Sequence, residues 1–147
     1  MSTDPSKNIF ANWTKAILLY CDGAFHQGYA KEPISYKNTK LYFRGSPNTR
    51  AHFAYLHSRF NLTNANKVVL SGSSAGGIST YAWIDYLKDY IANPAVKVYS
   101  VIDSGIFLDP AQNQLSKDSD GDSDTFYQVT NKDEGVPNQK CAKNLPK

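Results

Sequence analysis

Residues 72–76 read Gly-Ser-Ser-Ala-Gly and match the pattern Gly-x-Ser-x-Gly, in which a serine at a sharp strand-to-helix turn acts as a nucleophile. Ser74 is the candidate nucleophile. Side chains at Gly72 and Gly76 would collide with the bent backbone, so glycine is expected at both positions. The free N–H groups of a helix beginning near Ala75 would favour the negative charge on a carbonyl oxygen under attack. The motif therefore indicates attack on a carbonyl group by Ser74.

The same five residues could also form an ordinary turn, because small residues gather at turns for reasons unrelated to catalysis. The context favours the catalytic interpretation, since a predicted strand precedes the motif and a predicted helix follows it. Ser71, Ser73 and Ser79 lack this placement, and we interpret them as turn or helix-start residues.

Short apolar runs bounded by polar or turn-forming residues predict the strands that must position the motif. The first run, residues 16–20, is expected to be buried on both faces of a parallel sheet. The other predicted strands are residues 41–44, 68–70 and 96–102.

Two helices are predicted between these strands. Ser46 as a cap and Pro47 in the first turn mark the start of one, which presents Phe53, Leu56, His57 and Phe60 and ends before Asn61. The other follows the motif and stops at Pro94, with an apolar face of Thr80, Trp83, Ile84, Leu87 and Ile91. Strand and helix alternate, which predicts βαβ units and an α/β fold. We expect one domain over residues 1–147, with an irregular polar segment at 110–147.

Composition narrows the function classes. The 147 residues carry a net charge of +3 and are 41% hydrophobic, as expected of a chain with a core. The lysines are scattered without a basic stripe, so a nucleic-acid partner is not expected. No apolar run of about 18 residues predicts a membrane span, and the N-terminus has no signal-peptide h-region. The sequence calls for no cofactor and indicates no oligomeric state.

Three further patterns in the sequence could indicate disulfides, glycosylation or metal binding. Cys21 and Cys141 lack metal-ligand spacing, and they could pair with each other, stay free or pair with cysteines elsewhere. Asn12 and Asn61 begin glycosylation patterns that matter only in a secreted protein. Alternate aspartates in residues 118–124 are compatible with calcium, but Ser123 stands where an EF-hand loop needs glycine. We therefore expect a solvated acidic loop there and no metal site.

Four ordered blocks extend the serine motif. They read Tyr-Cys-Asp-Gly-Ala at 20–24, Leu-Tyr-Phe-Arg-Gly at 41–45, Leu-Ser-Gly-Ser-Ser-Ala-Gly-Gly at 70–77 and Asp-Ser-Gly-Ile-Phe-Leu-Asp at 103–109. Together they resemble the pectin acetylesterase/Notum family of serine esterases, from about residue 8 to residue 109 and more loosely to Cys141. The resemblance implies an α/β-hydrolase-like, mostly parallel sheet with flanking helices, and secretion. It also implies removal of an acyl group from a polysaccharide or from an acylated secreted protein.

The resemblance assigns roles to two residues of the motif. Ser74 matches the family's nucleophile, and Ala75 matches the residue whose backbone N–H forms part of the oxyanion hole. The family's Gly-Gly-Trp oxyanion loop would precede residue 1, and its catalytic aspartate and histidine would follow residue 147. The resemblance therefore implies a partial, incomplete chain whose catalytic acid and base lie outside it.

The three histidines all precede Ser74, whereas such hydrolases have the order Ser, Asp, His, so none matches the family's base. We expect His57 to pack at a core edge, His52 to be a solvated helix residue and His26 to be a loop residue. Asp22 and Asp103 are expected to accept turn N–H bonds, and Arg44 to pair with a carboxylate. Tyr81 and Trp83 are core or cleft-lining aromatic residues.

The sequence thus predicts part of a serine carboxylic ester hydrolase, with little turnover as an isolated chain because a missing base removes several orders of magnitude in rate. An alternative is a non-catalytic module that retains the fold to bind carbohydrate or protein. A third possibility is a complete small esterase that uses one of the three histidines as its base.

Overall fold

A computed structural model describes residues 2–105, 130 and 135–138, and its central feature is a βαβ unit. The unit consists of strand β3 (Lys67–Ser73), helix α2 (Ala75–Ile91) and strand β4 (Lys97–Asp103). A hairpin, a second helix and one turn of 3-10 helix precede it. These elements are β1 (Ile34–Tyr36), β2 (Thr39–Leu41), α1 (Gly45–Phe60) and η1 (Leu62–Asn64).

Strands β3 and β4 run parallel, in a register that pairs Lys67 with Lys97 and Ser73 with Asp103. Their β-branched and apolar residues alternate between two faces, and Val68, Leu70 and Val98 pack against the core. The predicted α/β class with parallel pairing is confirmed for this unit. The larger hydrolase-like sheet is not seen among the described residues, where the parallel sheet has two strands.

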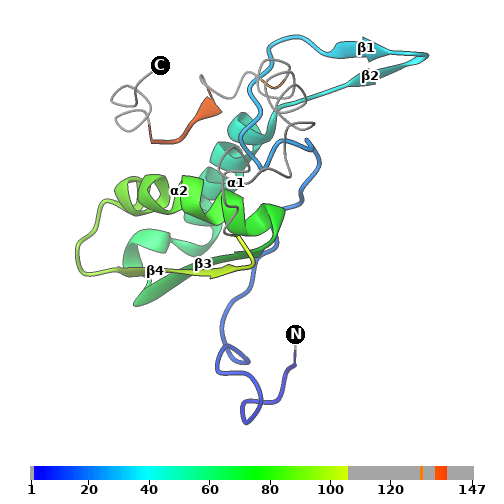
Figure 1. Cartoon of the computed structure of the whole chain (residues 1–147). Helices are drawn as coiled ribbons and strands as arrows, with labels where there is room; N and C mark the ends of the chain where they lie inside the picture. Colours follow the sequence, from blue (N-terminus) through cyan, green and yellow to red (C-terminus); the bar gives the residue numbers. More distant parts are fainter. Residues whose placement is uncertain (1, 106–129, 131–134, 139–147) are drawn as a thin grey trace, which may run out of the picture.

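Helices α1 and α2 lie on the same face of the parallel sheet (Figure 1). Between them and the sheet is the core, formed by Phe53, Trp83, Leu87, Ile91 and Val96. Phe53 and Trp83 meet edge to face with ring centroids 5.8 Å apart, and Arg50 lies over Tyr86 with its guanidinium carbon 4.5 Å from the ring centroid. The apolar face predicted for α2 is therefore confirmed, whereas that of α1 is confirmed at Phe53 and wrong at Phe60, which is 49% exposed.

The ends of the helices follow local rules only in part. Helix α1 begins at Gly45, and Ser46 is not its cap: this buried side chain donates its hydroxyl to the carbonyl of Gly135 at 2.8 Å. Both helices end where a non-glycine residue turns left-handed, at Asn61 (φ 48°) and at Ala92 (φ 52°). Helix α2 therefore ends ahead of Pro94, as predicted.

The strand predicted at residues 16–20 is wrong for this structure. The segment has no regular secondary structure and pairs with no described strand, and Ile17 and Leu19 are 86% and 70% exposed. Leu18 alone in the segment packs against the core. A strand needs a neighbour to receive its backbone hydrogen bonds, and apolar patterning cannot supply one.

The strand predicted at residues 41–44 is also wrong in extent and setting. Only Leu41 lies in a strand, at the end of an exposed antiparallel hairpin that pairs Ile34 with Leu41 and Tyr36 with Thr39. The hairpin projects away from the helices (Figure 1). Lys37 at its tip has φ 52°, a left-handed conformation that suits a tight turn.

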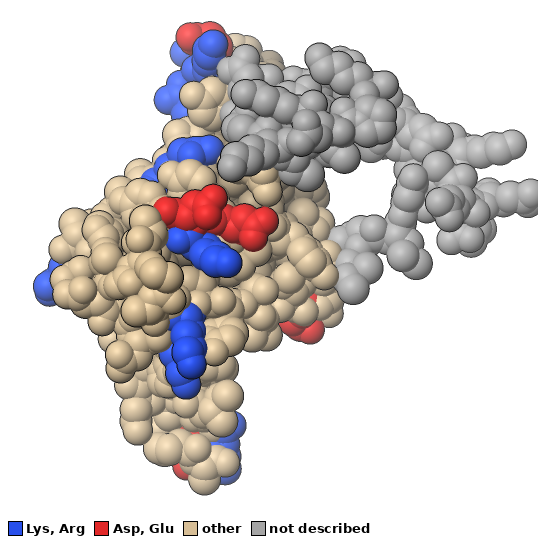
Figure 2. Space-filling view, turned by 90° about the vertical axis from the view of Figure 1, so that its left-hand side faces the viewer, with Lys and Arg blue, Asp and Glu red and all other residues tan. Residues whose placement is uncertain are grey.

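Charged side chains are spread over the surface. Figure 2 shows Lys and Arg residues as separate groups on a mostly uncharged face. Among the described residues, the ion pair within 4.0 Å is Lys7 with Asp4, at 3.9 Å on the surface, where such pairs contribute little. Neither described helix is long and apolar enough to cross a membrane.

Candidate active site

Ser74 lies at the turn between β3 and α2, the strand, turn and helix order that the sequence predicted. Its backbone has φ 54° and ψ −117°, a conformation that costs a non-glycine residue about 1–3 kcal/mol. Two hydrogen bonds hold it there: the Ser74 N–H donates to the Asp103 carbonyl at 3.0 Å, and the Ser74 carbonyl accepts from the Ile78 N–H at 3.1 Å. The strained turn is thus fixed by both neighbouring elements, and the residue is exposed.

The strained conformation frees the Ser74 hydroxyl. Ser74 is the N-cap of α2, a position where serine usually accepts a bond from a helix N–H. Here no side-chain cap bond forms, and the first turn of α2 contains no acidic residue to neutralise its N–H groups. The turn therefore combines a hydroxyl with the positive end of a helix that starts at Ala75.

The glycines around Ser74 serve different purposes. A Cβ on Gly72 would lie 2.2 Å from the Gly76 carbonyl oxygen, so the prediction of a steric requirement is correct there. At Gly76 the prediction is wrong, because a Cβ would meet nothing within 4 Å. A second close contact was not predicted from the sequence: a Cβ on Gly77 would lie 2.7 Å from the Gly105 Cα. Glycine at Gly77 and Gly105 lets α2 approach the end of β4.

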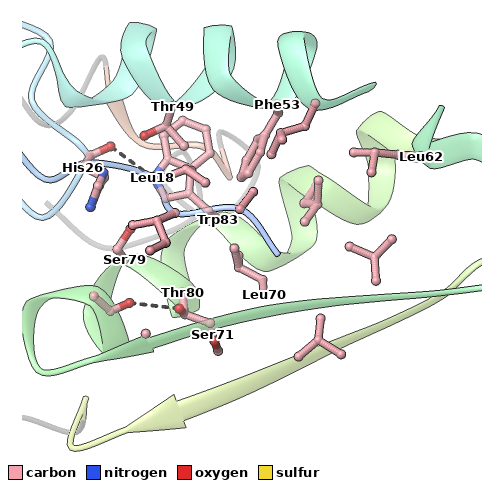
Figure 3. Close-up of a pocket in the computed structure, with 18 of the residues that line it drawn as sticks. Leu18, His26, Thr49, Phe53, Leu62, Leu70, Ser71, Ser79, Thr80 and Trp83 are labelled. Atoms are coloured by element: carbon pink, nitrogen blue, oxygen red, sulfur yellow. Dashed lines mark hydrogen bonds between the residues drawn. The ribbon is translucent and has the colours of Figure 1, made fainter. Parts of the chain in front are cut away.

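A cavity of about 1010 Å³ opens beside the turn. It is lined by core residues of the two helices, Phe53, Trp83 and Leu87, and by β3 and Ser74. Figure 3 shows Phe53 and Trp83 among the side chains that line it. Ser71 and Ser73 lie in β3 and Ser79 in the second turn of α2, so their interpretation as turn or helix-start residues is wrong. Thr80 donates its hydroxyl to the Gly76 carbonyl at 2.9 Å, whereas the Ser74 hydroxyl, which also lines the cavity, forms no hydrogen bond with another described residue.

His26 lies on a loop, as predicted, and lines the same cavity (Figure 3). Its carbonyl accepts a hydrogen bond from the Trp83 indole N–H at 3.1 Å, and its ring stacks on Tyr20 at 4.9 Å. Both Phe25 (φ 54°) and His26 (φ 58°) are left-handed, which is strained for such residues. Burial lowers the pKa of His26, Asp22 raises it less, and His52 lowers it further, so the environment favours the neutral imidazole. No hydrogen bond joins His26 to Ser74 among the described residues.

The other two histidines lie on α1. His57 packs at the edge of the core, with its ring 5.7 Å from that of Tyr90 and its Nδ1 3.4 Å from the Thr63 hydroxyl, as predicted. His52 is half-buried rather than solvated, and its Nδ1 is buried without a hydrogen-bond partner. Neither residue lines the cavity beside Ser74.

Asp22 organises the loop that carries His26. It is buried, and its two carboxylate oxygens accept hydrogen bonds from the N–H groups of Ala24 at 3.0 Å and Gly28 at 3.1 Å. The structural role predicted for Asp22 is therefore confirmed. Asp103 acts mainly through its backbone carbonyl, which holds Ser74, while its exposed carboxylate accepts a bond from the Ser104 hydroxyl at 3.2 Å.

The remaining predictions concern Arg44, two aromatic residues, the cysteines and the acidic segment. Arg44 donates to the Lys31 carbonyl at 2.8 Å and lies over the Tyr42 ring, so pairing with a carboxylate is wrong within the described residues. Trp83 belongs to the core, whereas Tyr81 is 53% exposed. Cys21 is free and exposed, and Cys141 and residues 118–124 lie outside the described residues. The described residues contain no cluster of three or more metal-ligating side chains.

Comparisons with known proteins bear on this site. The sequence model of the family described as Pectinacetylesterase matches residues 1–147. The chain is 38% identical over 110 residues to both pectin acetylesterase 4 and pectin acetylesterase 5 of Arabidopsis thaliana, covering 74% of this chain and 26% and 25% of theirs. It is 35% identical over 109 residues to pectin acetylesterase 11 of the same plant, with 26% of that protein covered. The chain thus spans about a quarter of the length of these curated relatives.

Proposed function

The chain belongs to the pectinacetylesterase family, and on this premise we propose that it supplies the serine nucleophile of a carboxylic ester hydrolase. The observation that carries the proposal is the strained, exposed Ser74 between a parallel strand and a helix N-terminus, with its hydroxyl free of a capping bond. Such a turn lifts a serine hydroxyl above the sheet, where an acyl group can approach it.

In the proposed reaction the Ser74 Oγ attacks the carbonyl carbon of an ester, and its proton passes to a histidine from polypeptide beyond this chain. The backbone N–H of Ala75 donates to the oxyanion, with the α2 dipole adding to the stabilisation. The alcohol leaves after the histidine returns the proton to it, and water then hydrolyses the acyl-enzyme. The proposed substrate is an acetylated polysaccharide, outside the cell; an acylated secreted protein is the alternative.

Among the described residues, no histidine forms a hydrogen bond with Ser74. This supports the proposal that the histidine acting as the base comes from polypeptide beyond this chain. The chain alone is then expected to hydrolyse p-nitrophenyl acetate at close to the background rate, because an unassisted serine hydroxyl is a weak nucleophile. The same observation favours the second candidate, a binding module without catalysis, which would retain carbohydrate affinity but no turnover.

A hybrid enzyme tests the proposal: this chain replaces the matched 110 residues of pectin acetylesterase 4, and the hybrid is assayed on p-nitrophenyl acetate and acetylated pectin. Ser74→Ala should reduce kcat by about 10⁶-fold, as for a triad nucleophile. Ser73→Ala is the matched control, since it is an exposed neighbouring serine, and its rate should stay within a fewfold of the unmodified hybrid. A folded hybrid without activity, or one whose activity survives Ser74→Ala, contradicts the proposal.

A further inference from the structure

The turn that joins α1 to β3 contains a sequence pattern for N-linked glycosylation, Asn-Leu-Thr at residues 61–63. Asn61 follows the last residue of α1 in a left-handed conformation, and the rest of the pattern lies in the 3-10 helix η1. Asn61 is exposed, and its side-chain amide forms no hydrogen bond with another described residue. The nitrogen that would accept a sugar is therefore accessible at the surface.

The backbone around Asn61 is held without the help of that amide. The Asn61 N–H donates to the His57 carbonyl at 2.8 Å, and the Asn61 carbonyl accepts from the Asn64 N–H at 2.9 Å. The side chain of Asn93 donates its Nδ2 to the Thr63 carbonyl at 2.7 Å, which ties the turn to the end of α2. Modification of the Asn61 side chain would thus break no hydrogen bond that holds the described part of the turn, so the folded chain can carry a substituent there.

The Asn61 side chain also avoids the cavity beside Ser74. Phe60 and Leu62 line that cavity, whereas Asn61 between them does not. The other glycosylation pattern begins at Asn12, which is exposed as well but lines the cavity together with the two residues that follow it. An N-linked oligosaccharide is bulky and hydrated, so it needs a side chain that leads into solvent. Asn61 meets this requirement better than Asn12.

We propose that Asn61 carries an N-linked glycan, an inference that rests on the extracellular location put forward with the proposed function. The Asn61 Nδ2 forms a bond to the anomeric carbon of a lipid-linked oligosaccharide. The lipid pyrophosphate leaves with the electron pair of the broken C–O bond, and the amide loses one proton to a base of the transferase. At about 3.3 Å per residue, β3 is roughly 20 Å long, with Asn61 ahead of its first residue and Ser74 after its last. The glycan is therefore attached at the end of β3 opposite to the nucleophile.

The test expresses the whole chain behind a secretion signal in a eukaryotic cell and treats the total protein, secreted and retained, with peptide N-glycosidase. Treatment should lower the mass in a discrete step, and in heavy-oxygen water it should leave an oxygen label at residue 61. Asn61→Asp should lose this glycan and its label, because the substitution removes the acceptor nitrogen while it tolerates the left-handed backbone. Asn12→Asp is the matched control and should keep both.

A pair of substitutions at Thr63 separates loss of the pattern from loss of the fold. Thr63→Ser keeps the hydroxyl that the pattern requires and should keep the glycan, whereas Thr63→Val keeps the shape of the side chain and should lose it. Ser74→Ala should also keep the glycan, so a failure of the proposed catalytic role would leave this result unchanged. The inference is overturned if residue 61 of the unmodified sequence acquires no label, or if the label persists in Thr63→Val.

Discussion

The β3–α2–β4 unit and residues 16–44 differ in how completely their backbone groups are satisfied nearby. In the unit, strands only a helix apart pair in register, and the strained Ser74 is held by Asp103 and Ile78. Residues 16–20 carry an equally apolar pattern but have no backbone hydrogen-bond partner among the described residues, where β1 and β2 pair with each other. The comparison teaches that an apolar pattern produces a strand only where another backbone edge is within reach.

The largest expected effect separates the packed core from residues 16–20. Phe53→Ala should lower the free energy of unfolding by about 3–5 kcal/mol, because it empties a buried site against Trp83. Ile17→Ala should change it by no more than about 0.5 kcal/mol, because that side chain is 86% exposed. Urea unfolding followed by circular dichroism measures both. Similar decreases in the free energy of unfolding for the two variants would contradict this difference in packing.

A smaller effect concerns the two glycines of the serine motif. Gly72→Ala should destabilise the protein by at least about 2 kcal/mol, because its Cβ would collide with Gly76 backbone that cannot move aside. Gly76→Ala is the matched control and should stabilise α2 by up to about 1 kcal/mol, since its Cβ meets open space. Thermal unfolding of both variants measures the two shifts in Tm, and equal shifts would contradict the difference in steric room between Gly72 and Gly76.

The sequence predicted features that depend on neighbouring residues better than features that depend on distant contacts. The order around Ser74, both helices and the apolar face of α2 were predictable, because periodicity, helix stop signals and glycine placement are local properties. The contacts and burial of Ser46, Arg44 and His52 were not predictable, because they depend on residues distant in the sequence or on the conformation of loops. The contact between Gly77 and Gly105 was only partly predictable. The sequence shows a glycine directly after the motif and another after β4, but that the two lie against each other follows only from the folded structure.

The smallest expected effect is a pH dependence centred on His26. Burial lowers its pKa in the folded state, so the unfolded chain binds its proton more readily. The stability that His26 contributes is therefore fully present above the unfolded value near 6.5 and is lost as the pH falls through the lower folded pKa. His26→Gln should flatten the dependence of Tm on pH below about 6.5. An unaltered slope in His26→Gln would contradict the burial of this ring.

The central claim is that Ser74 forms the covalent bond to the acyl group, and trapping that intermediate tests it most directly. The hybrid enzyme is mixed with p-nitrophenyl acetate, quenched in acid within one turnover and digested for mass spectrometry. The account predicts one acetyl group on the peptide containing Ser74, located on Ser74 by fragmentation and absent in Ser74→Ala. Acetyl on Ser73 or Ser79 instead, or turnover without any acetylated serine, would contradict it.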